Sequence, residues 1–325
     1  MIYCTVCIRE VDLKSKDFLS IADLTPERLK LLVSNAAALK AEGWNTLLSE
    51  KILVLMFEKP SLRTRVSFEV AMRQLGGYCL YLSPEEVGLG RRESVPDAAM
   101  VLSRYADAIA ARTFSHATVE TLATHASVPV INALSDLEHP CQALADLLTV
   151  YETRETLEGI TLAFVGDGNN VAHSLMLGAA LCGMNFRIAS PAGYEVKDNI
   201  LQVARGFAAE SGSEILCTPD PRRAVAGADV VYTDVWASMG QEAEAEQRRR
   251  VFSNYQVNDE LLSLARPDAV FMHPLPAHHG EEVAENILYR PQSVVFNQAE
   301  NRLHAQKALL VDILGGLEIP LANYP

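Results

Sequence analysis

Short apolar runs alternate along the chain with longer segments whose apolar residues recur at helical spacing. Residues 52–57 are a run of the first kind, which is typical of a buried strand. Residues 61–76 are a segment of the second kind, with a serine that can cap a helix at its start and a glycine that can end it. This stretch therefore predicts a strand, a tight turn and a helix.

The same alternation continues to the end of the chain. Further strands are predicted at 78–83, 108–112, 129–133, 160–165, 185–190, 214–217, 230–235, 269–273 and 294–297. Helices are predicted at 24–48, 95–105, 117–126, 140–152 and 299–314, and a loop at 84–94. Strands and helices in alternation favour an α/β fold with parallel sheets, in which ligands bind beyond the carboxyl ends of the strands.

Length and composition limit the class of protein. A chain of 325 residues suits two domains, and we place the division between 1–145 and 146–325. The formal net charge of −13 argues against a nucleic-acid surface, which needs a basic face. No run of 18 apolar residues and no signal peptide is visible, so we expect a cytoplasmic protein without membrane contact.

The six cysteines are scattered among apolar segments, which favours reduced, buried thiols over a disulfide framework. Cys4 and Cys7 form a CxxC pair, but no second pair follows at the spacing of a zinc site. We therefore predict neither a metal nor a redox role for them.

The first turn of the helix after residue 60 contains the first group of candidate functional residues. Ser61, Arg63, Thr64 and Arg65 place hydroxyl and guanidinium groups beside the free N–H groups at the positive end of the helix dipole. The alternative is an ordinary basic first turn with a serine cap, but cations are disfavoured there unless an anion accompanies them. The stretch therefore indicates an anion site, most naturally for phosphate.

Two further strand ends add groups of the same kind. Arg112 ends one predicted strand, and His139 with Gln142 follows another. Alone, Arg112 could be a surface ion-pair partner and His139 a hydrogen-bonded structural histidine. Together with the first helical turn, they place three polar strand ends at one edge of the predicted sheet.

The second half offers a Gly-rich turn that does not fit a dinucleotide. Gly166 and Gly168 are followed by Val171 where the fingerprint needs glycine or alanine, and no acidic residue ends the next strand. Asn169 and Asn170 at the helix start instead suggest recognition of a zwitterion. Asp234 at a strand end could hold an ammonium group or be an ordinary loop carboxylate, and the charged run 241–250 is predicted to be a solvated helix face.

Five motifs in this order resemble those of the aspartate/ornithine carbamoyltransferase family, and the resemblance covers nearly the whole chain. The motifs are Ser61-Leu62-Arg63-Thr64-Arg65, His139-Pro140-Cys141-Gln142, Gly166-Asp167-Gly168-Asn169-Asn170, Asp234 to Gly240, and Ala299-Glu300-Asn301-Arg302. The Asp234 to Gly240 loop, D-x-W-x-S-M-G, resembles the ornithine members.

The resemblance implies two substrates, carbamoyl phosphate and ornithine, and citrulline as a product of arginine metabolism. The implied carbamoyl-phosphate residues are Ser61, Leu62, Arg63, Thr64, Arg112, His139, Gln142, Pro274, Leu275 and Arg302, of which Thr64, Arg112, His139 and Gln142 would act on the carbamoyl group. The implied ornithine residues are Asn170, Asp234, Ser238 and Met239. It also implies no metal or cofactor, homotrimers, a site in a cleft that closes between the domains at a subunit boundary, and a last helix from about 299 that packs back on the first domain.

Three positions depart from the ornithine pattern. Leu62 replaces a second hydroxyl residue, and Gly88 stands where several members carry a glutamine or histidine that reaches a neighbouring subunit. Pro274 replaces a cysteine, so no thiolate is available there. We therefore hypothesise that the substrate amine loses its proton in solution or through Asp234, with a rate that rises above neutral pH.

Other functions are compatible with part of these observations. The same reaction could use putrescine or an acylated ornithine, and Pro274 weakens the preference for ornithine. A non-catalytic ligand-binding relative is disfavoured because Arg63, Thr64, Arg112, His139 and Gln142 are all present. A nicotinamide-dependent dehydrogenase is disfavoured by the glycine pattern.

Overall fold

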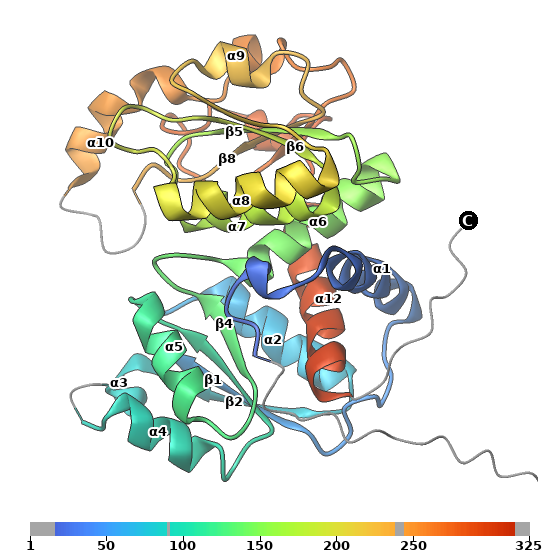
Figure 1. The fold of residues 1–325 in the computed structure, drawn as a ribbon, viewed down its shortest axis with the longest axis vertical. Helices are drawn as coiled ribbons and strands as arrows, with labels where there is room; N and C mark the ends of the chain where they lie inside the picture. The colour runs from blue at the N-terminus through green and yellow to red at the C-terminus, as the bar shows by residue number, and fades with distance from the viewer. Residues whose placement is uncertain (1–16, 90–91, 238–243, 316–325) are drawn as a thin grey trace, which may run out of the picture.

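Two parallel sheets form the framework of the molecule (Figure 1). The computed structural model describes residues 17–89, 92–237 and 244–315. The first sheet has the order β2-β1-β3-β4 and comprises β1 (Ile52–Phe57), β2 (Tyr78–Leu82), β3 (Ala108–Arg112) and β4 (Val130–Leu134). The second has the order β7-β6-β5-β8-β9 and comprises β5 (Thr161–Val165), β6 (Asn185–Ala189), β7 (Ile215–Thr218), β8 (Val230–Thr233) and β9 (Val270–Met272).

Helices cover both faces of each sheet. Those of the first half are α1 (Pro26–Glu42), α2 (Leu62–Gln74), α3 (Pro84–Val87), α4 (Val95–Leu102) and α5 (His116–His125). Those of the second half are α7 (Asn170–Cys182), α8 (Asp198–Ser211), α9 (Pro221–Val225), α10 (Ala245–Val251) and α11 (Asp259–Leu262). Helices α6 (Pro140–Arg154) and α12 (Val295–Leu314) lie between the halves, and single 3₁₀ turns occupy Ile21–Asp23, Ser253–Tyr255 and Ile287–Tyr289.

The alternation of side chains along β1 shows why its run of six apolar residues needs both faces covered. Leu53, Leu55 and Phe57 belong to the same buried cluster as residues of α1, α2 and α12. Val54 and Met56 point the other way and pack with residues of α4 and α5. Because a parallel sheet is buried on both sides, its strands read as continuous apolar runs, as the sequence predicted.

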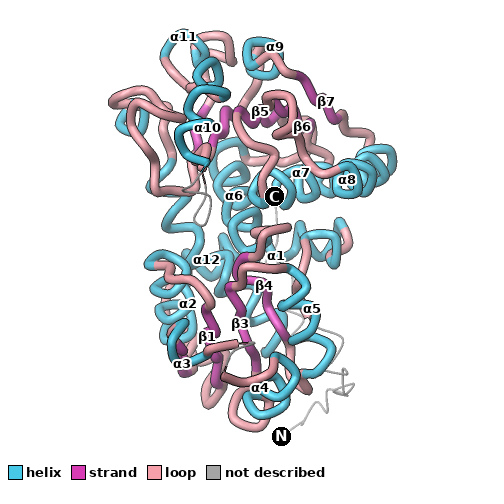
Figure 2. The backbone as a smooth tube through the Cα atoms, turned by 90° about the vertical axis from the view of Figure 1, so that its left-hand side faces the viewer, coloured by secondary structure: helices cyan, strands magenta, loops and turns pink. Residues whose placement is uncertain are grey.

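The largest buried cluster is shared by the two halves. It contains strand residues of both sheets together with α1, α6, α7 and α12. Helix α12 comes last in the described chain, yet it packs against α1, α2 and α6, so the chain returns to its first half (Figures 1 and 2). Inside this core the ammonium group of Lys307 donates to the carbonyl oxygens of Leu39 and Gly43 and so satisfies the end of α1.

The strand order places a crevice at the same relative position in each half. In the first sheet the chain moves from β1 to β2 on one side and then to β3 on the other, so the order reverses between β1 and β3. In the second sheet it reverses between β5 and β8. In open parallel sheets ligands bind at such reversals, beyond the carboxyl ends of the strands. The residues after β1, β3, β5 and β8 are therefore the natural binding groups.

The predicted α/β fold with two parallel sheets is confirmed, but two predicted elements were wrong. Residues 294–297 are not a strand, because all but the first lie in the opening turn of α12; their short apolar run does not distinguish a strand from a buried helix. The predicted loop 84–94 begins with α3. Its capping box joins Ser83 and Glu86 through reciprocal bonds between side chain and backbone, a signal present in the sequence.

The cysteines follow the prediction only in part. Cys141 and Cys182 are buried and Cys79 is partly buried, whereas Cys217 is exposed because it lies on β7, at the edge of the second sheet. These four are free thiols, and Cys4 and Cys7 lie outside the described residues. Among the helices that the structure describes, none combines the length and apolarity needed to cross a membrane.

Candidate functional site

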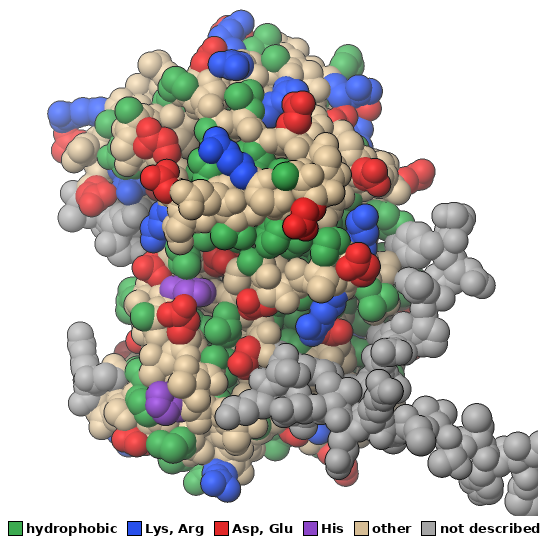
Figure 3. Space-filling model, viewed as in Figure 1, with side chains coloured by type: hydrophobic (Ala, Val, Ile, Leu, Met, Phe, Trp, Pro, Cys, Tyr) green, Lys and Arg blue, Asp and Glu red, His purple; other side chains and the backbone are tan. Residues whose placement is uncertain are grey.

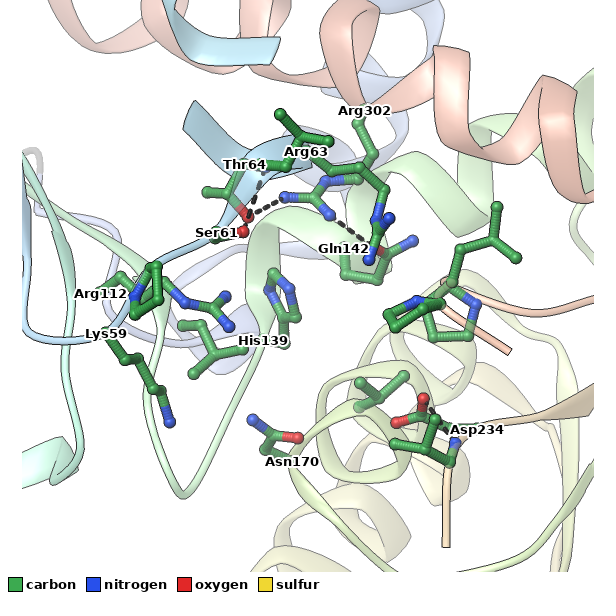
Figure 4. Close-up of a pocket in the computed structure, with 18 of the residues that line it drawn as sticks. Lys59, Ser61, Arg63, Thr64, Arg112, His139, Gln142, Asn170, Asp234 and Arg302 are labelled. Carbon is green, nitrogen blue, oxygen red and sulfur yellow. Dashed lines mark hydrogen bonds between the residues drawn. The ribbon is translucent and has the colours of Figure 1, made fainter. Parts of the chain in front are cut away.

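A cleft of about 390 Å³ lies where the reversal points of the two sheets face each other (Figure 4). Twelve residues named by the sequence as candidates line it: Ser61, Leu62, Arg63, Thr64, Arg112, His139, Gln142, Asn170, Asp234, Pro274, Leu275 and Arg302. Ser238 and Met239 lie outside the described residues. The fold thus gathers groups from the first half, from the second half and from α12 around one space.

The start of α2 forms the first wall of the cleft. Ser61 is the N-cap of this helix, and its hydroxyl accepts a hydrogen bond from the backbone N–H of Thr64. The remaining N–H groups of the first turn have no partner within the helix and stand at the positive end of its dipole. Burial lowers the pKa of Arg63, which lines the cleft beside them.

Arg65 does not join this wall, although the sequence placed it in the anion site with Arg63. Its Nε donates to Glu69 Oε1 at 2.8 Å, and its guanidinium stacks over the Tyr81 ring at 3.9 Å. Residues two positions apart on a helix point in different directions, so a single helical turn cannot aim both arginines at one ligand. Arg65 supports the outer surface of the first half instead.

Arg302 reaches the cleft from α12 and is almost fully buried. One terminal nitrogen donates to Thr64 Oγ1 at 2.9 Å and the other to Gln142 Oε1 at 2.7 Å, as the dashed lines in Figure 4 show. Because the Thr64 oxygen accepts from Arg302, its own hydrogen remains available to a second acceptor. Arg302 therefore orients two polar side chains toward the same space.

The positive groups of the cleft repel one another. Burial and the nearby guanidinium groups of Arg302 and Arg63 lower the pKa of Arg112 to about 10. Asp234 is the one carboxylate among the described residues that line the cleft, and it belongs to the opposite half. A multiply charged anion placed among the three arginines would remove this repulsion, since buried charges need counter-charges.

His139 is held between these cations as a neutral ring. Burial, followed by the charges of Arg302, Arg112 and Lys59, lowers its pKa well below the ordinary value. Its backbone N–H donates to Ser174 Oγ on α7, and among the described residues its Nδ1 has no partner. A neutral imidazole can donate one hydrogen bond to a developing negative charge without releasing a proton.

A buried network behind the cleft connects both halves. The Asp146 carboxylate accepts from Gln142 Nε2 at 2.8 Å, Gln298 Nε2 at 2.7 Å and the Tyr232 hydroxyl at 3.0 Å. These groups come from α6, α12 and β8, and Gln142 continues the network to Arg302. Burial is the main cause that raises the pKa of Asp146 to about 6. Hydrogen bonds thus fix both the nitrogen and the oxygen of the Gln142 side-chain amide.

The second half contributes a smaller polar wall. Asn170 lines the cleft, and its Nδ2 donates to the backbone oxygen of Ser135 at 2.7 Å, which ties α7 to the loop after β4. Asn169, which the sequence paired with Asn170 as a ligand group, instead caps α7 and donates to Asp234 Oδ2 at 2.8 Å. Burial is the main cause that raises the pKa of Asp234.

The charged run after residue 241 is not simply a solvated face. Glu244 and Arg248, four residues apart in this run, form an ion pair, but Arg248 is buried and also donates to Asp167 Oδ2 at 2.7 Å and to the carbonyl oxygen of Trp236. Helical spacing reveals pairs within the helix and cannot reveal a partner that tertiary structure brings from the turn after β5. Arg248 thus braces the loop that carries Asp234.

The loop after β9 closes one side of the cleft. Leu275 has a left-handed backbone, with φ of 55°, and its N–H donates to His273 Nδ1 at 2.9 Å. That bond makes His273 Nδ1 an acceptor, so its Nε2 donates to the buried Glu282. Non-glycine residues in this conformation are strained and are found preferentially at ligand sites.

In the part of the chain that the structure describes, one group of side chains has the spacing to hold a metal ion. Ligand atoms of His278, Glu281 and Glu282 lie within 4.8 Å of one another. Glu282 already accepts from His273 and from the His278 backbone, so the cluster is accounted for as a support of the loop after β9.

Sequence reasoning missed several lining residues: Lys59, Pro60, Leu134, Val171, Val235, Ala237, Pro276 and His278. Most are neighbours of predicted residues and contribute backbone or apolar surface. Lys59 is different because it carries a charge. Its position two residues after β1, at a strand end facing the ligand side of the sheet, is the signal that could have identified it.

Comparison with known proteins identifies the relatives of this chain. Residues 16–152 match the family model "Aspartate/ornithine carbamoyltransferase, carbamoyl-P binding domain", and residues 158–313 match "Aspartate/ornithine carbamoyltransferase, Asp/Orn binding domain". The ornithine carbamoyltransferase of Anoxybacillus flavithermus is 55% identical over 94% of this chain and 98% of its own, and that of Pyrococcus abyssi is 52% identical over 95% and 98%. The solved structure of the Pyrococcus furiosus ornithine carbamoyltransferase is 51% identical and superposes with a TM-score of 0.91 over 95% of this chain and 100% of that one.

The Asp146 network predicts a specific dependence of stability on pH. The pKa of Asp146 is about 6 in the folded protein against an ordinary 3.8, so folding favours the protonated form. The associated stability is present below the ordinary pKa and is lost as the pH rises through about 6. We expect wild type to lose about 2 kcal/mol of unfolding free energy relative to Asp146→Asn between pH 4.5 and 7.5, at 1.36 kcal/mol per pKa unit. Denaturant titrations of both proteins measure this difference, and a difference independent of pH would contradict the assignment.

Proposed function

The chain belongs to the aspartate/ornithine carbamoyltransferase family, and we propose that it transfers the carbamoyl group of carbamoyl phosphate to the side-chain amine of L-ornithine, giving L-citrulline and phosphate. One observation carries the proposal. A corner made of a helix N-terminus and three arginines faces a wall with Asn170 and Asp234 across a single cleft. The first suits a phosphorylated donor, and the second suits an amino acid.

The donor side would hold carbamoyl phosphate. Ser61, Leu62, Arg63 and the free N–H groups of α2 would surround the phosphate, and Arg112 would contact both the phosphate and the carbamoyl oxygen. Pro274 and Leu275 cover the donor from the loop after β9, and Arg302 holds Thr64 and Gln142 in position. Phosphate leaves into a pocket that already neutralises it.

Catalysis would rest on positioning and on stabilisation of the oxyanion. Carbamoyl phosphate carries a good leaving group, so no covalent nucleophile is needed. Arg112, neutral His139 and the free hydrogen of Thr64 can donate to the carbamoyl oxygen, each contributing roughly 3 kcal/mol if well aimed. Gln142 would hold the carbamoyl amide, because the bonds to Arg302 and Asp146 fix its orientation.

The acceptor side would hold ornithine. Asp234 can receive the α-ammonium group, and Asn170 keeps a carbonyl oxygen and one N–H for the backbone part of the amino acid. Ser238 and Met239 complete the proposed set. Pro274 offers neither a thiolate nor an N–H, so the side-chain amine would reach the carbonyl carbon after losing its proton to solvent or to Asp234.

Assembly, direction and location belong to the same proposal. We infer a homotrimer with the site near a subunit boundary and, since the relative from Pyrococcus furiosus is named anabolic, a role in arginine biosynthesis. The division between residues 145 and 146, a cytoplasmic location and closure of the cleft stay predictions.

On the face seen in Figure 3, acidic and basic side chains are interspersed over both halves. No nucleic acid or membrane partner is part of the proposal.

Exposed apolar side chains on α2 and on the edge strand β2 support self-association at this edge of the first half. On α2, Leu62 is 75% and Val66 45% exposed, and on β2, Tyr78 is 65% and Leu80 51% exposed. Exposed apolar surface of this kind marks protein interfaces, and Leu62 stands at the start of α2. A neighbouring subunit docked there would lie next to the phosphate side of the cleft.

The function is tested with a citrulline assay. Carbamoyl phosphate is offered with ornithine, putrescine, acetylornithine and aspartate in separate reactions, and each carbamoylated product is measured. We expect turnover with ornithine and much lower rates with the others. Turnover with aspartate and none with ornithine would overturn the substrate assignment.

Arg112 is tested by substitution. Arg112→Ala is expected to lower kcat by roughly 100- to 1,000-fold because a buried donor to the developing oxyanion is removed. Arg112→Lys should recover only part of the rate, since a lysine keeps the charge without the planar fork. Arg187→Ala, an arginine that donates to Ala226 on the surface of the second half, is the matched control. An unchanged kcat in Arg112→Ala would remove this residue from the reaction.

The proposed interface is tested by mass measurement in solution. Leu80→Glu places a charge among the exposed apolar side chains of the edge strand β2 and is expected to convert trimers to monomers in light scattering. Val203→Glu introduces the same change at a 43% exposed valine on α8 and should leave the mass unchanged. Intact trimers in Leu80→Glu would exclude this face as the interface.

A further inference from the structure

His139, which the proposed function makes a donor to the carbamoyl oxygen, is held through its backbone. In the view of Figure 4 its ring stands between Arg112 and Gln142, and among the described residues its Nδ1 has no hydrogen-bond partner. The residue is the N-cap of α6, but its side chain makes no capping bond. Its backbone N–H donates to Ser174 Oγ at 2.9 Å. The direction of the imidazole therefore depends on this backbone bond rather than on a bond to Nδ1.

The hydroxyl group of Ser174 donates as well as accepts. Ser174 is fully buried in α7, a helix of the second half, and its hydroxyl donates to Glu138 Oε2 at 2.9 Å. A serine inside a helix can otherwise donate to the carbonyl oxygen one turn earlier, which here belongs to Asn170. The Glu138 carboxylate competes with that carbonyl oxygen and keeps a lone pair of the hydroxyl directed at the His139 N–H. Glu138 thus sets the orientation in which Ser174 accepts.

Glu138 directly precedes His139 in the chain and is 2% exposed. Its carboxylate also accepts from the hydroxyl of Ser20 and from the backbone N–H of Ile21 at 3.2 Å, at the start of the first 3₁₀ turn. Among the described residues Glu138 forms no ion pair, and burial is the main cause that raises its pKa. A buried carboxylate without a cation opposes folding, so its presence favours a role in geometry over a role in stability.

We propose that Glu138 and Ser174 are positioning residues, which hold the backbone of His139 so that the imidazole is aimed at the carbamoyl oxygen. Neither is among the described residues that line the cleft, so both act through His139. The hydrogen bonds join the turn at Ser20, the loop after β4 and α7, so segments of both halves fix this one residue. The inference rests on the proposed function and extends it to residues behind the cleft.

The first test removes the acceptor of the His139 N–H by Ser174→Ala in the full-length protein. We expect kcat for citrulline formation to fall roughly 10- to 100-fold, because a misdirected donor stabilises the oxyanion poorly. KM for ornithine should not change, since the acceptor wall is untouched. Binding of inorganic phosphate, measured by calorimetry, should not change either, because phosphate contacts the arginines. An unchanged kcat in folded Ser174→Ala would overturn the inference.

A double-mutant cycle with His139→Ala separates the aiming of the ring from general damage to the fold. When the imidazole is absent, the backbone of residue 139 has no ring to aim, so Ser174→Ala should no longer lower kcat. A loss of overall packing would instead lower kcat by the same factor in both backgrounds, and this result would refute a role through His139. The residual rate of His139→Ala is measured at high enzyme concentration, with citrulline as the product.

Glu138 is tested by two substitutions of similar size. Glu138→Gln keeps an oxygen for Ser174, and its amide nitrogen can donate to the Ser20 hydroxyl, so kcat should stay close to that of wild type. Glu138→Met removes every acceptor and should lower kcat as Ser174→Ala does. The double variant Glu138→Met/Ser174→Ala should be no slower than either single variant, because both act along one chain of bonds. Equal rates for Glu138→Gln and Glu138→Met would contradict the mechanism, and this pair decides the question if Ser174→Ala does not fold.

Ser103→Ala is the matched control. The Ser103 hydroxyl also accepts a backbone N–H, from Ser127 at 3.0 Å, and donates to the carbonyl oxygen of Ala99, but it lies at the end of α4 and does not line the cleft. This variant should keep the kcat of wild type, and a loss equal to that of Ser174→Ala would count against the inference. A wild type that makes no citrulline would instead refute the proposed function, so the two failures are distinguishable.

Discussion

Repulsion among buried cations is the constraint on which the cleft depends. Arg63, Arg112 and Arg302 face one space, and burial with mutual repulsion lowers the pKa of Arg112 to about 10. Such a cluster opposes folding, because these guanidinium groups lose water and form no direct ion pair with a carboxylate among the residues that the structure describes. The surrounding apolar core must supply the stability to hold it. An anionic ligand would balance the positive charge of the three arginines. Binding would then relieve their mutual repulsion, and this relief contributes to the affinity for an anion.

The architecture meets this constraint by making the arginines part of structures that are rigid for other reasons. Arg302 stands on α12, which is packed against α1, α2 and α6. Its two hydrogen bonds lead through Gln142 to the buried Asp146, where α6, β8 and α12 meet. The helices and the strand that carry this polar network also contribute to the apolar core that the two halves share. Positions in the cleft are fixed by the packing of whole helices, and catalysis by positioning needs this precision.

Much of the framework could be predicted from periodicity and strand ends, because a buried parallel strand and a capped helix leave strong local signals. The run 52–57, the cap at Ser61 and the polar groups after β1, β3 and β8 were of this kind. The failures have different causes. The direction of Arg65 follows from the geometry of a single helix and from its pair with Glu69 four residues on. The bond from Arg248 to Asp167 and the bond from Asn169 to Asp234 join segments that are distant in the sequence. The start of α12 was misread because three consecutive apolar residues carry too little periodicity.

The packing of α12 against the first half has a consequence for folding during translation. Residues 17–134 leave the ribosome well before residues 295–314. During this time the surfaces of α1 and α2 that α12 later covers are exposed. The cleft also lacks Arg302 during that time. Synthesis of α12, more than folding of either half alone, therefore delivers the last wall of the cleft. A cut between the two sheets would separate α12 from the surfaces of α1 and α2 that it covers.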